Sequence, residues 1–252
     1  IKNLFRKKLI KSFERAHKDK IFIDINSPES FEEFFWKKEM NNNYINKSFL
    51  LKKNLSDLNI DEFKKYIELV LIRYNKKMYL SKNNNNILRI NDLLKGIKNS
   101  IFLIFFRDPI NQSASLLNQH INFSKIHKKN KFSLKYMNYL GHYEFGENAK
   151  RFDIGEYMYE DKFDINYWLE IWNNYYSYVV NNLQKERIVF ICYEDLANNP
   201  NEYLKSKIKI NEFTTNVNFN EFKNMNTIVK EKVNDKIKEK AYIVYSKLKN
   251  LN

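Results

Sequence analysis

The chain has 252 residues, 43% hydrophobic and 16% aromatic, enough for one large α/β domain or two small ones. Its formal net charge of +14 would suit nucleic acid, a membrane surface or an anionic small molecule. The lysines are dispersed among many asparagines and isoleucines, a bias that AT-rich coding also produces, so the charge alone does not indicate a function.

The single cysteine and the shortness of the apolar runs exclude further classes of protein. The single cysteine, Cys192, excludes an intrachain disulfide and fits a reducing, cytoplasmic compartment. No apolar run approaches the ~20 residues of a membrane span, and no signal peptide is visible. With only 4 Gly and 3 Pro there is little material for linkers, so we expect residues 1–252 to form a single domain. Because the first residue is Ile1 rather than Met, we expect a longer natural sequence.

The first third of the chain alternates helical and strand patterns. Apolar spacing predicts a helix over 4–20 and a short strand over 21–25. The segment SPESFEEFFWKK, residues 27–38, predicts a helix that starts near Ser27, and a clear amphipathic pattern predicts another over 61–74. Three acidic residues are interpreted as first-turn carboxylates that the helix dipole favours, namely Glu29, Glu32 and Glu33. A catalytic carboxylate among them is the alternative.

The centre of the chain is typical of a parallel crossover. A strand over 78–81, a helix over 87–97 and an Ile/Phe-rich strand over 101–106, buried on both faces, are predicted in succession. Two strands joined by a helix make a right-handed crossover, so both strands end on the same side of the sheet. Lys82 and Arg107 follow these two strands, and we therefore expect both cations at one sheet edge.

Arg107 opens the segment RDPINQSAS, residues 107–115. Asp108 can cap a helix and Pro109 suits its first position, so the segment predicts a tight turn from strand to helix. Ligands of open α/β sheets bind at such strand ends, and a helix N-terminus there favours an anion. Arg107 would add a forked cation, most naturally for phosphate. The alternatives are a structural ion pair for Arg107 and a solvated side chain for Lys82.

A basic, exposed connection with some helical character is predicted over 123–136, followed by LGHYEFG at 140–146, a distinctive stretch in so Gly-poor a chain. Its two glycines indicate required backbone geometry. His142 and Glu144 could serve acid–base chemistry or contact substrate, and could equally hold the loop together by hydrogen bonds. No His/Cys cluster has the spacing of a metal site, so no metal is predicted.

The last third completes an α/β pattern. A long helix with an aromatic stripe is predicted over 164–183, and a buried strand over 187–193. Helices are predicted over 198–208 and 235–251. The aromatic stripe is interpreted as core rather than as a cofactor site.

RDPINQSAS resembles the 3′-phosphate-binding motif of sulfotransferases that use 3′-phosphoadenosine 5′-phosphosulfate (PAPS). In that motif a strand-end Arg and a Ser eight positions later hold the 3′-phosphate, and the matching residues are Arg107 and Ser115. Lys82, in YLSKNN, resembles the family lysine that approaches the transferred sulfuryl group. The order of SPESFEEFFW, LGHYEFG, YWLEIW and VFICYEDL is also similar to bacterial sulfotransferases, over roughly residues 21 to 210.

The resemblance implies an α/β, P-loop-like three-layer fold with a short parallel sheet flanked by many helices. It implies in-line sulfuryl transfer from PAPS to an acceptor hydroxyl or amine, without a metal. Arg107 and Ser115 would bind PAPS, and Lys82 would stabilise charge on the leaving oxygen or the sulfuryl oxygens. His142 and Glu144 are candidates on the acceptor side. The acceptor, whether carbohydrate, lipid, peptide or small molecule, is not indicated.

The family's 5′-phosphosulfate loop, a Gly/Ser/Thr-rich strand–loop–helix near the domain start, has no counterpart before Ile21. We therefore expect an N-terminally incomplete fold whose first strand and loop lie upstream. The alternatives are an inactive homologue and a basic nucleic-acid-binding protein, which would need cations and aromatics interleaved on one surface. A nucleotide kinase would need a GxxxxGK[ST] loop, which the sequence lacks.

Overall fold

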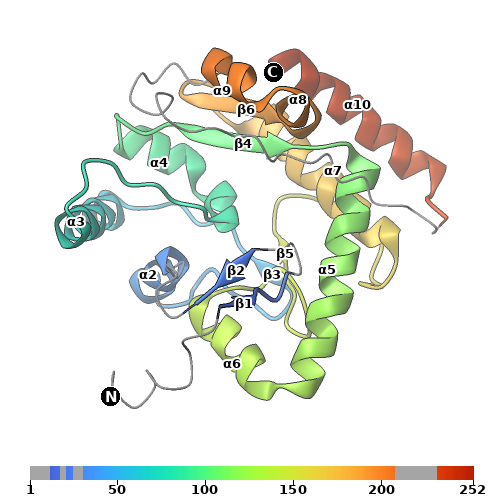
Figure 1. The fold of residues 1–252 in the computed structure, drawn as a ribbon, viewed down its shortest axis with the longest axis horizontal. Helices are drawn as coiled ribbons and strands as arrows, with labels where there is room; N and C mark the ends of the chain where they lie inside the picture. The colour runs from blue at the N-terminus through green and yellow to red at the C-terminus, as the bar shows by residue number, and fades with distance from the viewer. Residues whose placement is uncertain (1–11, 18–20, 25–30, 208–231) are drawn as a thin grey trace.

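The computed structural model describes residues 12–17, 21–24, 31–207 and 232–252 as a mixed α/β protein (Figure 1). The helices are, in chain order, α2 (Glu32–Glu39), α3 (Asp57–Tyr74), the 3₁₀ helix η1 (Asn84–Leu88), α4 (Ile90–Gly96), α5 (Pro109–Lys129), α6 (Lys131–Leu140), α7 (Ile165–Asn182), α8 (Tyr193–Asn198), α9 (Pro200–Lys207) and α10 (Asp235–Leu251). Among these residues, no helix is long and apolar enough to cross a membrane.

The main sheet of the described residues pairs β4 (Phe102–Phe106) with β6 (Ile188–Cys192) in parallel, in register from Phe102 opposite Ile188 to Phe106 opposite Cys192. Each strand leads into a helix at its carboxyl end, β4 into α5 and β6 into α8. The predicted short parallel sheet with flanking helices is therefore confirmed. The parallel pairing places the residues that follow β4 and the residues that follow β6, which are far apart in sequence, at the same edge of the sheet.

One face of β4 is buried and the other is partly exposed. Ile104 and Phe106 are buried, whereas Leu103 and Phe105 are 37% and 50% exposed. The prediction that this strand is buried on both faces is thus wrong. The reason is that α7 and α10 pack on a single side of the sheet, so the alternating residues on the other side are covered only in part.

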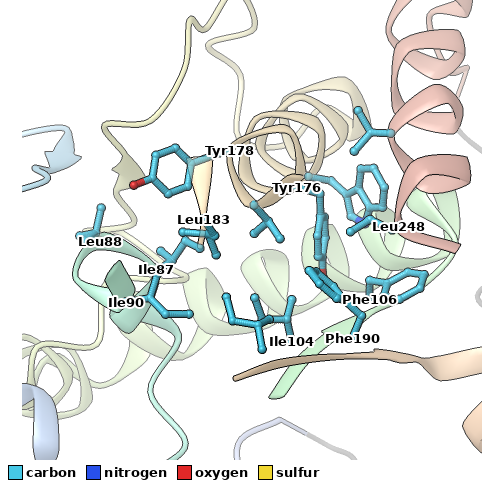
Figure 2. Close-up of a cluster of buried hydrophobic side chains, with 14 of the residues drawn as sticks. Ile87, Leu88, Ile90, Ile104, Phe106, Tyr176, Tyr178, Leu183, Phe190 and Leu248 are labelled. Atoms are coloured by element: carbon cyan, nitrogen blue, oxygen red, sulfur yellow. The ribbon is translucent and has the colours of Figure 1, made fainter. Parts of the chain in front are cut away.

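The main core lies between this covered face and the long helices (Figure 2). Strand residues Ile104, Phe106 and Phe190 are directed toward Tyr176 of α7 and Leu248 of α10. The helix α10 packs along α7 and also contacts α5 and β6. The aromatic stripe predicted for residues 164–183 is core, as expected, and it anchors the sheet from which α5 starts.

The predicted crossover before β4 is wrong. Residues 78–81 form no strand, and the predicted helix over 87–97 is divided into η1 and α4. Side chains hold this segment instead of a backbone ladder. Asn83 caps η1 by accepting the backbone N–H of Asn85, and the Tyr79 hydroxyl donates to Glu32 on α2. The parallel partner of β4 comes from β6, later in the chain.

Several element bounds differ from the predictions for local reasons. The helix α3 begins at Asp57 rather than residue 61, because Ser56 caps it in a reciprocal box with Asn59. The region predicted as an exposed connection over 123–136 is helical, being the end of α5 and most of α6, with Asn130 capping α6. Phe123 and His127 are buried there, so the stretch contributes to the interior.

Two small sheets complete the described fold. β1 (Phe13–Glu14) pairs antiparallel with β2 (Phe22–Ile23), and β3 (Phe49–Leu50) pairs in parallel with β5 (Arg151–Phe152). Most of the helix predicted over 4–20 lies outside the described residues, and its described part contains β1 instead. Ser27, the predicted start of the next helix, also lies outside them, whereas the described helix α2 begins at Glu32.

Candidate functional site

The turn from β4 into α5 has the predicted form. β4 ends at Phe106, Arg107 follows, and Asp108 is the N-cap of α5. Oδ1 of Asp108 accepts the backbone N–H of Asn111 at 2.9 Å, and Pro109 occupies the first helical position. Local sequence rules for helix starts therefore determine this part of the site.

Arg107 and Ser115 both belong to this strand–turn–helix unit. The guanidinium of Arg107 lies over the ring of Tyr193, 4.7 Å from its centroid, and Tyr193 is the first residue after β6. Ser115 is half-buried on α5. It lies six residues beyond Pro109, so it is about 9 Å along the axis from the helix start. A ligand that contacts both side chains would run along the first two turns of α5.

Carboxylates share this edge of the sheet with Arg107. Oε1 of Glu194 accepts the backbone N–H of Asp108 at 2.9 Å. Oε2 of Glu194 accepts the hydroxyl of Tyr245 at 3.2 Å, and Oδ2 of Asp108 accepts the hydroxyl of Tyr242 at 2.9 Å. The end of β4, which was predicted to bind an anion through positive side chains, therefore carries both positive and negative side chains. Both carboxylates are engaged by donors of the protein, which offsets part of their repulsion toward an anion.

Of the three predicted catalytic residues, His142 and Glu144 lie side by side in the loop after α6, and Lys82 acts on both electrostatically. Nδ1 of His142 lies 3.7 Å from Oε1 of Glu144, and these side chains are 30% and 26% exposed. The Glu144 carboxylate raises the pKa of His142, against the effects of burial and of nearby Lys82. Burial alone would raise the pKa of Glu144, but His142 and Lys82 together hold it below its usual range. Lys82 is therefore within electrostatic reach of both.

This Lys82–His142–Glu144 cluster does not have the predicted relation to β4. Lys82 follows a segment that forms no strand, so the argument that placed it beside Arg107 at one sheet edge no longer applies. The two groups of predicted site residues belong to separate elements. Arg107 and Ser115 lie on β4 and α5, and the cluster lies on the loops before η1 and after α6.

A buried ion pair contributes to the electrostatic surroundings of the cluster. Nη1 and Nη2 of Arg89 lie 3.0 and 3.1 Å from Oε2 and Oε1 of Glu33, and both side chains are almost fully buried. The hydroxyl of Tyr44 also donates to Glu33. Glu33 in turn acts on His142, whose pKa it helps to raise. Paired and hydrogen-bonded charges of this kind hold their surroundings in one geometry.

Glu32 is the second buried carboxylate, and the asparagine run next to Lys82 satisfies it. Nδ2 of Asn86 donates to Oε1 of Glu32 at 2.7 Å. Nδ2 of Asn83 lies 3.1 Å from the same oxygen and 2.8 Å from Oε2 of Glu33, so it bridges the two carboxylates. These amides fix the backbone that carries Lys82. Glu32 and Glu33 lie in the first turn of α2, as predicted, and they are also buried structural partners of the site.

The available sequence signal for this network was the run of four asparagines after Lys82. Amide groups supply two donors each and suit a buried carboxylate. The sequence does not show which carboxylates they meet, because Asn83 and Glu33 are 50 residues apart.

Two neutral histidines of α5 hold the loop that follows α6. The backbone N–H of Gly146 donates to Nδ1 of His120, and that of Glu147 donates to Nδ1 of His127, each at 3.2 Å. Burial lowers the pKa of His120 to about 4 and also lowers the pKa of His127. At neutral pH both rings therefore accept hydrogen bonds.

The two glycines of LGHYEFG have the backbone geometry that the sequence indicated. Gly141 and Gly146 have φ values of +83° and +82°, and Gly141 ends α6 as its C-cap. A Cβ at Gly146 would lie 2.2 Å from Nδ1 of His127. The loop that carries His142 and Glu144 therefore depends on glycine at this point.

The cluster offers acid–base and electrostatic chemistry. His142 has its Nδ1 directed at Glu144, which leaves Nε2 to exchange a proton. Lys82 supplies a positive charge in the same place. In the described ranges, no group of three or more His, Cys, Asp or Glu side chains could hold a metal ion.

Comparisons with family models, curated proteins and solved structures found no match for this chain. Support for a function therefore comes from the residues of the chain itself.

Proposed function

We propose that this chain is a PAPS-dependent sulfotransferase with a P-loop-like fold, which transfers a sulfuryl group to an acceptor hydroxyl or amine. The observation that carries the proposal is the unit formed by β4 and α5. Arg107 stands at the end of a parallel strand and Ser115 on the helix that starts there, in the order and spacing of the 3′-phosphate motif.

Arg107 and Ser115 would hold the 3′-phosphate. A guanidinium donates two parallel hydrogen bonds to a phosphate, and a serine hydroxyl adds a third. The ring of Tyr193 keeps the Arg107 guanidinium in place from one side. The nearby carboxylate of Glu194 would repel a bound anion. Its two oxygens, however, accept hydrogen bonds from the backbone N–H of Asp108, the hydroxyl of Tyr245 and the thiol of Cys192.

Bound PAPS would supply the sulfuryl group, and the cluster would serve the acceptor and the leaving oxygen. Nε2 of His142 would take the proton of the acceptor, while Glu144 orients the ring and favours the protonated form that results. Lys82 would stabilise the negative charge that develops on the leaving oxygen. This assignment of Lys82, His142 and Glu144 rests on their proximity and on the resemblance of the lysine motif.

Calorimetric titration with 3′-phosphoadenosine 5′-phosphate tests the nucleotide half of the proposal. We expect Arg107→Ala to weaken binding on the order of ten- to a hundredfold, since hydrogen bonds to charged groups contribute ~1.5–3 kcal/mol. Ser115→Ala should weaken it less. Adenosine 5′-phosphate, which lacks the 3′-phosphate, should bind wild type weakly and be insensitive to Arg107→Ala.

The matched control is Arg73→Ala, which removes the same charge from an exposed position at the end of α3. Equal affinity of wild type and Arg107→Ala would overturn the site. Nucleotide binding without sulfuryl transfer to any of a panel of hydroxyl and amine acceptors would instead indicate an inactive homologue.

A further inference from the structure

The stretch from Pro109 to Tyr143 contains no acidic residue, although it spans 35 positions of the chain. It contains five lysines, all of them exposed, at the end of α5 and on α6: Lys125, Lys128, Lys129, Lys131 and Lys135. Figure 1 places α6 at one end of the molecule, away from the β4–β6 sheet. Glu147, just beyond this stretch, pairs with Lys131 at 3.1 Å, so the positive charge is unbalanced within residues 109–143 and is partly offset from outside them.

The outward face of α6 is aromatic. Phe132, Tyr136 and Tyr139 follow a spacing of i, i+4 and i+7, so they lie on one side of the helix, and they are 72%, 37% and 58% exposed. The rings of Phe132 and Tyr136 stack at 5.9 Å, and the ring of Tyr139 contacts Phe34 of α2 at 4.9 Å. The three aromatic residues and the five lysines are called the α6 surface below.

The other side of α6 is already used by the fold. Met137 contacts His127 of α5, and Leu140 is buried at the helix end. The exposed rings therefore form a second apolar face of α6, in addition to the side that packs against the rest of the protein. Exposed aromatic side chains gathered on one helix, beside lysines, characterise an amphipathic helix that lies in a lipid interface.

We infer that the α6 surface docks the protein onto an anionic lipid surface. Tyr and Phe rings are stable at the level of the headgroups, where the ring is apolar and the Tyr hydroxyl remains hydrated. The lysines would be attracted to anionic headgroups within a Debye length, with no carboxylate of residues 109–143 to oppose them. This inference is independent of sulfuryl transfer.

The geometry favours lipid over single-stranded nucleic acid. Nucleic acid is bound by a charged groove that follows its backbone and by rings with free faces for the bases. Phe132 and Tyr136 already cover one face of each other. Two cavities among the described residues are lined by other segments, one by Lys52, Arg89 and Tyr178 and one by Glu39, Met40 and Asn59. A convex aromatic helix suits a flat lipid surface better.

Co-sedimentation of the full chain with unilamellar vesicles tests the inference. Vesicles of phosphatidylcholine with about 30 mol% phosphatidylserine should bind the protein on the order of tenfold or more better than phosphatidylcholine alone. Phe132→Ser and the double variant Lys128→Glu/Lys129→Glu should each reduce binding several-fold, and added salt should weaken it. All substituted residues are exposed, and circular dichroism checks that the variants fold.

Two matched control variants lie outside the α6 surface, one in α3 and one just after it. Lys76→Glu/Lys77→Glu reverses an adjacent exposed pair, and Ile72→Ser removes an apolar side chain that is 77% exposed. Both should leave vesicle binding unchanged. Equal loss in the two lysine variants would overturn the inference, because it would assign binding to net charge. Absence of binding to the anionic vesicles would also overturn it. Tight binding of a fluorescent oligothymidine that Phe132→Ser abolishes would then assign the α6 surface to nucleic acid.

Discussion

Arg89 and Glu33 form a two-contact ion pair inside the protein, with nitrogen–oxygen distances of 3.0 and 3.1 Å and side chains that are 2% and 3% exposed. Removing one partner leaves the other charge buried, which typically costs ~3–5 kcal/mol. We predict that Glu33→Ala lowers the free energy of unfolding by about this amount, as measured by urea denaturation. Because Glu33 supports the loop before η1, the variant should also disturb the surroundings of His142.

The control for this prediction is Glu62→Ala on α3, which removes a carboxylate from the exposed ion pair with Lys65. Surface pairs of this kind contribute little, so its denaturation midpoint should barely change. A Glu33→Ala midpoint equal to that of Glu62→Ala would contradict the role given to the buried pair.

His120 accepts the backbone N–H of Gly146, and burial lowers its pKa to about 4. In the unfolded chain a histidine titrates near ~6.5, so the unfolded state binds more protons between these values. The stabilising contribution is fully present above pH ~6.5 and is lost as the pH falls toward 4. It amounts to about 3 kcal/mol at most.

The variant His120→Asn tests this dependence, because its Oδ1 can accept near the position of Nδ1 but does not titrate. We predict that its free energy of unfolding, measured in urea at several pH values, falls less than that of wild type between pH 6.5 and 4. Parallel wild-type and variant curves would show that His120 is not responsible.

Three of the four histidines of the chain should titrate in a defined order. The Glu144 carboxylate raises the pKa of His142, whereas burial lowers that of His120 and His127. In an NMR titration of the ring Cε1–H signals, we predict that His142 titrates above the usual 6.5 and the two α5 histidines below it. Glu144→Gln should move the His142 midpoint to lower pH.

The contact between His142 and Glu144 also contributes to stability, but its pH dependence is opposite to that of His120. Because the folded-state pKa of His142 is raised, its contribution is fully present below pH ~6.5 and is lost as the pH rises through the folded value. A His142 signal that titrates together with His120 would contradict the contact with Glu144.

Asp108 links three elements at the end of β4. Oδ1 caps α5 through Asn111, and Oδ2 accepts the hydroxyl of Tyr242 on α10. Loss of a cap costs ~1 kcal/mol and loss of a further hydrogen bond about as much, so Asp108→Ala should lower the free energy of unfolding by about 2 kcal/mol. Asp108→Asn keeps an acceptor for the cap and should lose less. Thermal and urea unfolding of the two variants would separate these contributions, and equal losses would contradict the capping role.

The sequence by itself determined the features that depend on near neighbours. The strand before Arg107, the Asp108 cap, Pro109 at the first helical turn and the positive φ of Gly141 and Gly146 all follow from local rules. The placement of Arg107 at a strand end and of Ser115 on the following helix could therefore be predicted. The strand over 78–81 was wrongly predicted because an apolar run is also compatible with an irregular segment that side-chain hydrogen bonds hold, such as that of Tyr79 to Glu32.

Only the tertiary structure decided which distant groups meet. Arg89 and Glu33 are 56 residues apart, and the proximity of Lys82 to His142 and Glu144 depends on contacts among α2, η1 and the loop after α6. The single covered face of β4 and the exposed aromatic face of α6 likewise depend on where other helices pack. Burial and charge pairing are properties of neighbours in space, and hydrophobic pattern and capping describe neighbours along the chain.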